Sequence, residues 1–181
     1  YLGMGVPGVT VTMSGNEGSG TTGSDGYYEV LVSPESTPTA TPTKAGCTFN
    51  PPTRTYPPIT VCQTGQDYTG YVTISGYTRK STGEAIPDVL VGFDNGGGAV
   101  QSGANGYYVN TLFYGWQGTL TPILAGYVFS PLAKTYTSGV TASAGNVNFT
   151  GTRTVTISGT ITDGGAGVAG VTVKFVSGAG V

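Results

Sequence analysis

The sequence contains no histidine and only nine aspartate and glutamate residues. Histidine is the most frequent general base and the commonest metal ligand, so its absence excludes Ser-His and Cys-His nucleophile pairs. The carboxylates stand mostly alone, in glycine-rich or turn-like surroundings. We therefore expect that the chain is not an enzyme and that it has no catalytic residues, no metal site and no cofactor.

Positive charge and long apolar segments are also scarce. The seven lysine and arginine residues are scattered singly, whereas nucleic-acid binding needs a basic stripe. No apolar run approaches the roughly 18 residues of a membrane span. We therefore expect neither nucleic-acid binding nor membrane insertion. Hydrophobic residues make up 38% and the net charge is −2, a balance that is typical of folded rather than disordered chains.

The sequence repeats itself at a spacing of about 80 residues. Residues 25–28 read Asp-Gly-Tyr-Tyr, and residues 105–108 read Asn-Gly-Tyr-Tyr. The sequence Val-Thr-Ile-Ser-Gly occurs at residues 72–76 and again at 155–159. Because several such matches keep a nearly constant spacing, we interpret them as tandem units, each long enough to hold a small core.

These matches divide the chain into three parts. Residues 1–70 form repeat one without its first strand, residues 71–152 form a complete repeat two, and residues 153–181 hold the opening strands of a repeat three. Two interpretations of the incomplete repeats stay open. The chain is cut from a longer array, or the strand at 153–163 of one copy completes repeat one of the next.

Within a repeat the apolar residues alternate with a period of two. The odd-numbered residues of 9–13 and of 89–93 are apolar. This alternation indicates half-buried strands, the second of them over residues 86–93, and no stretch carries a helical pattern. About seven short strands in 80 residues predict an all-β fold of tandem antiparallel β-sandwiches. Asn110 breaks the apolar phase, so we expect a bulge or a hydrogen-bond partner there. The side chains that we expect to point inward in repeat two are Ile74, Val89, Val91, Phe93, Tyr108, Leu112 and Phe129.

The motifs of the repeat resemble those of a known family. They are Ile-Ser-Gly at 74–76, the Gly-Tyr-Tyr turns, and Ala-Gly-Tyr-Val-Phe-Ser-Pro at 125–131 followed by Thr135-Tyr136. Over nearly the whole chain they resemble carboxypeptidase-regulatory-like or Cna-B-like repeats of bacterial surface and secreted proteins. The resemblance implies an Ig-like or transthyretin-like sandwich in an extracellular setting. It does not extend to the Lys–Asn isopeptide bond of some members, because no lysine recurs at equivalent positions.

The two cysteines, Cys47 and Cys62, both lie in repeat one. A zinc site is excluded, because no histidine or further cysteine is present to complete four ligands. Two interpretations remain, a pair of free thiols or a disulfide between consecutive strands. The resemblance to secreted proteins and the even number of cysteines favour the disulfide.

Three further features are candidates for contacts. Phe113, Tyr114 and Trp116 cluster at one turn, where they form an interaction surface for a glycan or cover the end of the sandwich. Asn148 begins a glycosylation sequon. Residues 94–98 read Asp-Asn-Gly-Gly-Gly; they lack the alternating acidic ligands of a calcium loop, and we interpret them as a turn.

Together these features predict an extracellular structural protein, secreted or on the cell surface, that forms a stalk, sheath or filament. Its expected partners are copies of itself, head to tail, or neighbouring repeats of a longer chain. The alternative is an adhesin or a carbohydrate-binding accessory module of a secreted protein, with glycans as partners.

Overall fold

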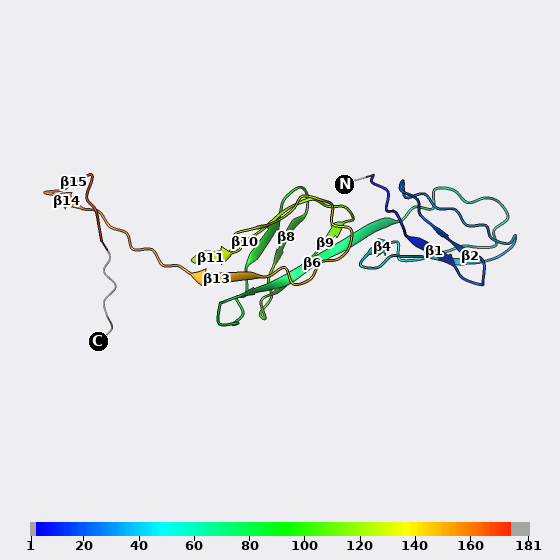
Figure 1. Ribbon diagram of the computed structural model, residues 1–181, viewed down its shortest axis with the longest axis horizontal. Coiled ribbons are helices and arrows are strands. Elements are labelled where there is room, and N and C mark those ends of the chain that lie inside the picture. Colours follow the sequence, from blue (N-terminus) through cyan, green and yellow to red (C-terminus); the bar gives the residue numbers. More distant parts are fainter. Residues whose placement is uncertain (1–2, 175–181) are drawn as a thin grey trace.

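The computed structural model describes residues 3–174 and is built from short strands and turns, with no helix among these residues (Figure 1). No described segment is therefore a helix that could cross a membrane. Antiparallel pairing dominates the sheets. The prediction of an all-β, sandwich-like fold is confirmed.

The structure contains fifteen strands among the described residues. They are β1 (Thr10–Met13), β2 (Gly18–Thr21), β3 (Thr39–Thr43), β4 (Thr48–Asn50), β5 (Arg54–Thr55), β6 (Thr69–Arg79), β7 (Leu90–Phe93), β8 (Gly98–Gln101), β9 (Tyr107–Phe113), β10 (Gly118–Ile123), β11 (Tyr127–Ser130), β12 (Lys134–Tyr136), β13 (Phe149–Arg153), β14 (Thr162–Asp163) and β15 (Ala166–Gly167).

Residues 71–153, which we call the central unit, form a two-layered sandwich. One sheet has the order β12-β10-β7-β8, and the other is made by β11, β13, β6 and β9. Alternate side chains of both layers meet in one core. All seven side chains that were predicted to point inward are buried there. The Asn110 side-chain amide donates a hydrogen bond to the Gly97 carbonyl at 2.8 Å. Asn110 therefore has a hydrogen-bond partner, one of the two expected outcomes at this position.

One predicted strand is shorter than expected. The pattern predicted a strand from residue 86, but β7 begins only at Leu90. Asp88 adopts a positive φ of 61°, a conformation that an extended strand does not contain. The amide of Val89 instead donates to the hydroxyl of the buried Ser102. Residues 86–89 therefore form a bend with Ile86 and Val89 buried and Pro87 and Asp88 exposed, in which side-chain and backbone hydrogen bonds replace strand pairing.

Residues 3–70, which we call the N-terminal unit, have one regular four-stranded sheet, in the order β2-β1-β3-β5. Its buried core consists of Val9, Val11, Ala40 and Tyr56. Residues 27–33 match the sequence of β9, yet they form no strand. The reason is pairing: β9 is held along its length by β6, and no described segment of the chain lies beside 27–33 in that way.

Strand β6 continues through both units (Figure 1). Its first residues pair with β4 of the N-terminal unit, with Thr48 opposite Tyr71 and Asn50 opposite Thr69. From Tyr71 to Tyr77 it pairs with β9, and its last residues pair with β13. The two units therefore share one strand rather than a linker.

Beyond β13 the chain leaves the central unit as an extended segment (Figure 1). Residues 154–174 are exposed throughout, and their only strands are the two-residue pair β14 and β15. The predicted repeat three is thus described only to residue 174, and the rest of it lies outside the described residues. Residues 155–159, the second Val-Thr-Ile-Ser-Gly segment, pair with no strand in this structure.

We predict that Leu120→Ala lowers the free energy of unfolding of the central unit by about 2–5 kcal/mol, because it leaves a cavity in a packed core. Leu120 is fully buried, with 0% of its surface exposed. Leu132→Ala is the matched control, because Leu132 is 72% exposed and its loss should change stability by less than about 0.5 kcal/mol. Urea unfolding of both variants measures the difference. Equal effects would show that Leu120 is not a core residue.

Candidate functional site

The most elaborate set of contacts outside the cores is the junction between the two units. It is built from β6, from residues 44–47 of the N-terminal unit and from residues 139–144 of the central unit. Residues 44–47 form the turn between β3 and β4, and residues 139–144 belong to the connection between β12 and β13.

Hydrogen bonds join the turn to the connection. The backbone amide and the hydroxyl of Ser143 both donate to the carbonyl of Gly46, each at 2.8 Å. The same hydroxyl accepts from the amide of Thr73 in β6 at 2.9 Å. One serine side chain therefore links the shared strand to the N-terminal unit. Gly46 has a φ of +73°, and a Cβ there would lie 2.9 Å from that of Ala142, so the close approach favours glycine.

Apolar packing closes the rest of the junction. Val6 and Cys47 pack against the core of the central unit. Gly70, the second residue of β6, is surrounded by side chains from both units: an added Cβ would lie 3.1 Å from Val6 and 3.5 Å from Tyr114. The shared strand is thus buried where it passes from one unit to the other.

The predicted aromatic interaction surface is largely buried. Trp116 is 2% and Tyr114 7% exposed, and both belong to the core of the central unit. Trp116 donates its indole N–H to the carbonyl of Asp94 at 3.2 Å. Burial also raises the pKa of Tyr114. Phe113 is 40% exposed and stacks on Tyr71 of β6, with ring centroids 5.2 Å apart. Tyr114 and Trp116 therefore cover the core, and Phe113 alone remains accessible.

The predicted disulfide is not formed, and Cys47 and Cys62 are both free thiols. The register of β4 and β6 explains why. Thr48 lies opposite Tyr71, so Cys47 comes next to the junction, and its thiol donates to the carbonyl of Thr141 at 3.5 Å. Cys62 is exposed in the segment between β5 and β6, which contains no strand, and it lines the second hollow described below, whereas Cys47 lines the first.

The glycine-rich turn at residues 94–98 is closed by its own hydrogen bonds. One carboxylate oxygen of Asp94 accepts from the amide of Thr119 at 2.7 Å. Asn95, Gly96 and Gly98 have positive φ angles, as tight turns require. No group of three or more acidic or cysteine side chains in the described part of the chain is placed to hold a metal.

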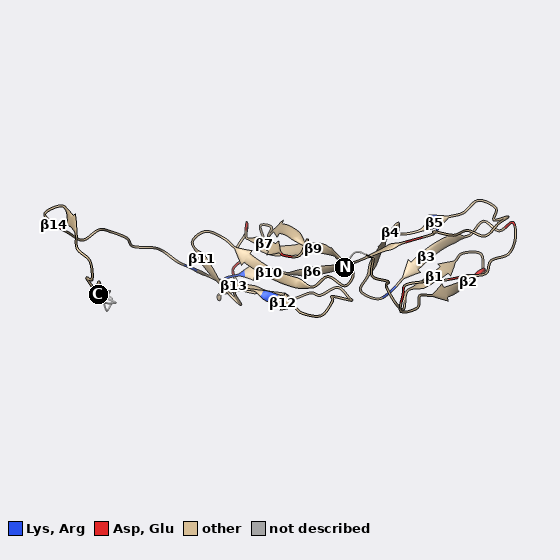
Figure 2. Ribbon diagram, turned by 90° about the horizontal axis from the view of Figure 1, so that it is seen from above, with Lys and Arg blue, Asp and Glu red and all other residues tan. Residues whose placement is uncertain are grey.

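Asn148, the sequon residue, is exposed, and its side-chain oxygen accepts a hydrogen bond from the amide of Tyr77. Its glycosylation stays a prediction. Charged residues are few and spread over both units (Figure 2). The one ion pair among the described residues joins Lys80 and Glu84 at 2.8 Å, on the surface.

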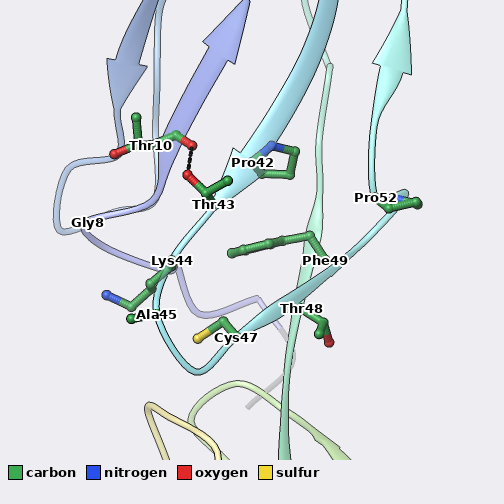
Figure 3. Close-up of a pocket in the computed structure, with 10 residues that line it drawn as sticks. All are labelled: Gly8, Thr10, Pro42, Thr43, Lys44, Ala45, Cys47, Thr48, Phe49 and Pro52. Carbon is green, nitrogen blue, oxygen red and sulfur yellow. Dashed lines mark hydrogen bonds between the residues drawn. The ribbon is translucent and has the colours of Figure 1, made fainter.

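Two hollows lie in the N-terminal unit. The first, about 870 Å³, is an open depression beside the turn at 44–47 (Figure 3). Two of its polar side chains already have partners: the ammonium of Lys44 donates to the carbonyl of Pro7 at 2.8 Å, and the hydroxyl of Thr43 donates to the carbonyl of Thr10. Burial raises the pKa of the Cys47 thiol, which makes it a poor nucleophile. This depression offers no evident chemistry.

The second hollow is a groove of about 1070 Å³ along the open side of the N-terminal unit. Residues 25–32 and 59–70 line its two sides, and Val9, Val11 and Tyr56 of the small core contribute to its floor. Tyr28, Val30 and Val32 are half-buried along it. The sequence predicted that repeat one lacks a strand, and one of the two interpretations above places a strand of another copy there; the groove itself is seen only in the structure.

No protein-family model matches the chain, so membership of the carboxypeptidase-regulatory-like or Cna-B-like family stays a prediction. Over 114 residues, 60% of its length, the chain is 38% identical to chitinase ChiA of Flavobacterium johnsoniae, and this match spans 7% of that chitinase. Among solved structures, the Bacillus anthracis TIE protein resembles 83% of the chain, with 12% identity and a TM-score of 0.38, and the match covers 31% of that protein.

We predict that Cys62 reacts with iodoacetamide at pH 8 at least about ten times faster than Cys47. Cys62 is exposed, whereas burial raises the pKa of Cys47, so a smaller fraction of Cys47 is thiolate at that pH. Peptide mass spectrometry of protein prepared without reductant gives both rates. In Cys62→Ser the fast phase should vanish and the slow one remain. A peptide pair linked through both sulfurs would contradict the structure.

Proposed function

We propose that the chain is a structural module of an extracellular protein, in which β-sandwich units joined through shared strands form a stiff part of a stalk, sheath or filament. The observation that carries this proposal is strand β6, which belongs to the sheets of both units. A flexible linker lets neighbouring domains reorient. A shared strand does not, because any bend at the junction must break backbone hydrogen bonds.

The contacts around β6 support the same function. Ser143 ties the strand to the turn at Gly46, and Val6 packs across the boundary. The described residues offer no cluster of reactive side chains at the junction or in the first hollow. An elongated, weakly charged module suits a mechanical role better than a catalytic one (Figures 1 and 2).

The similarity to part of a chitinase favours a second candidate function. Because the match spans 7% of that protein, the shared region is small enough to be an accessory region outside its catalytic part. In that role the chain would be a spacer or a carbohydrate-binding module. Of the predicted aromatic surface, only Phe113 is exposed for stacking on a sugar.

We predict that a Gly-Ser-Gly-Ser insertion between Gly70 and Tyr71 makes the chain flexible in solution. It interrupts β6 where the strand passes between the units, and it separates Val6 from its contacts. Small-angle X-ray scattering should show a single elongated particle for the wild type and a broad range of maximum dimensions for the insertion. The matched control is the same insertion between Gly83 and Glu84, in an exposed turn. This control insertion should leave the scattering curve unchanged. A wild type as flexible as the junction variant would contradict the proposal.

We predict that the wild-type chain is not retained on chitin, and that Phe113→Ala behaves identically. Retention of the wild type together with its loss in Phe113→Ala would replace the structural function by the carbohydrate-binding one. Leu132→Ala, another exposed apolar position, controls for nonspecific retention. Affinity electrophoresis in soluble glycol chitin gives the same comparison in solution.

A further inference from the structure

The outward face of the β6–β9 ladder carries an aromatic pair at each end. Tyr71 lies opposite Phe113, and Tyr77 lies opposite Tyr107. The ring centroids are 5.2 Å apart in both pairs, a separation at which aromatic rings are in contact. The side chains between the pairs on this face carry no ring and no charge; they are Thr73, Ser75, Val109 and Thr111. Only the pair of Tyr77 and Tyr107 has a phenol on both strands.

This tyrosine pair is both held in place and accessible. The guanidinium of Arg79 lies 4.4 Å from the ring centroid of Tyr77, and it donates a hydrogen bond to the carbonyl of Gly83 at 2.9 Å. A cation over an aromatic ring is attracted to its face, so Arg79 restrains the ring of Tyr77 beside Tyr107. Tyr107 is 38% exposed, so a reagent in solution can reach the pair.

Among the described residues, Tyr28 and Tyr68 are the other two tyrosines whose rings are in contact, at 6.3 Å. The phenol of Tyr28 donates its proton to the carbonyl of Gln66 at 2.8 Å, and burial raises the pKa of Tyr28 to about 12. The hydroxyl oxygen of Tyr68 is buried. The surroundings of this second pair therefore oppose the loss of a phenol proton and restrict access to it.

We propose that Tyr77 and Tyr107 are an oxidative crosslinking site, at which a one-electron oxidant, a peroxidase with hydrogen peroxide, forms a dityrosine bond between β6 and β9. The proposal rests on the structural function above and adds a covalent bond to the strand on which that function depends. Cys47 and Cys62 are both free thiols, so no disulfide ties the strands of the described chain together.

The oxidation balances without a further reagent. The peroxidase takes one electron and one proton from each phenol and reduces one hydrogen peroxide to two molecules of water. The two phenoxyl radicals then couple through a new carbon–carbon bond between one Cε of Tyr77 and one Cε of Tyr107. The hydrogen of each bonded carbon moves to the phenol oxygen of the same ring, which restores both phenols. Because the rings already touch, rotation of the side chains brings the two carbons together without opening the ladder.

The bond changes the path of force through the central unit. Tyr77 is the last residue of β6 that pairs with β9, so the bond stands at the end of the ladder. It closes a loop that contains β7 and β8. Tension that enters through β6 then passes directly to β9 and does not extend the two strands within the loop.

The first experiment treats dilute protein with a heme peroxidase and hydrogen peroxide and isolates the monomer by gel filtration. The monomer should show dityrosine fluorescence. Trypsin should release residues 55–79 joined to residues 81–134, with the loss of two hydrogens. Tyr107→Phe should abolish this product, because phenylalanine forms no phenoxyl radical. Tyr27→Phe is the matched control: Tyr27 occupies the equivalent position of the N-terminal unit and is 64% exposed, and its loss should leave the yield unchanged.

A rescue variant tests whether the position on the ladder decides the coupling. Phe113→Tyr places a second phenol beside Tyr71, at the same 5.2 Å centroid distance. Combined with Tyr107→Phe, it should restore a crosslink between the same two tryptic peptides. All these substitutions are at exposed positions and keep an aromatic ring, so the variants should fold.

The second experiment stretches single molecules by their two ends, before and after oxidation. The closed loop of about 30 residues spans about 100 Å when extended. Unfolding of the oxidised central unit should therefore release a chain that is shorter by about that length. Tyr107→Phe should release the full length under both conditions.

Four results would overturn the proposal: no dityrosine in the monomer, a main product that joins residues 1–44 to 55–79, an undiminished yield in Tyr107→Phe, or no rescue by Phe113→Tyr. The second result would assign the crosslink to Tyr28 and Tyr68. Each of them would leave the structural function standing, because the scattering comparison involves no oxidation. A flexible wild type would refute the structural function whether or not the crosslink forms.

Discussion

The backbone pairing of β6 is the constraint on which the rest of the structure depends. This strand pairs with β9 in the sheet of the central unit. Its first residues pair with β4, and that pairing fixes the position of the N-terminal unit. The contacts of Ser143 with Gly46 and of Val6 with the central core can form only because β6 has already brought the two units together. Since the strand is buried at Gly70, between Val6 and Tyr114, water cannot replace its hydrogen bonds there, and opening the junction leaves polar groups unpaired.

The two units show how much one strand contributes to a small sandwich. They share matching sequences and matching hydrogen bonds, such as Thr39 to Thr55 and Thr119 to Thr135, each at 3.0 Å between hydroxyls. Yet the buried core of the central unit includes Ile74, Tyr108 and Leu112, whereas Tyr28 and Val32, which match the last two, remain half-buried. The three buried side-chain polar atoms without a partner in the described residues, on Ser36, Arg54 and Tyr68, all belong to the N-terminal unit. The N-terminal unit thus has a less buried core and less complete side-chain hydrogen bonding than the central unit.

The sequence predicted the strands and the buried side chains of the central unit because alternation with a period of two is a local signal. Val89, Val91 and Phe93 carry it, although Gly92 lies between the last two. Features that depend on register were not predictable in this way. The extension of β6 back to Thr69 passes through Gly70, a residue that strands usually avoid. The separation of Cys47 from Cys62 follows from the pairing of β4 with β6, and the burial of Trp116 follows from its indole reaching Asp94 across a turn. None of these features can be inferred from the spacing of residues along the chain.

The direction of the shared strand also decides how the molecule bears load. β6 runs roughly along the long axis of the molecule, so tension applied along that axis acts nearly parallel to the strand (Figure 1). Hydrogen bonds between antiparallel strands are perpendicular to the strands, so such a force shears the whole ladder with β9 rather than opening one bond at a time.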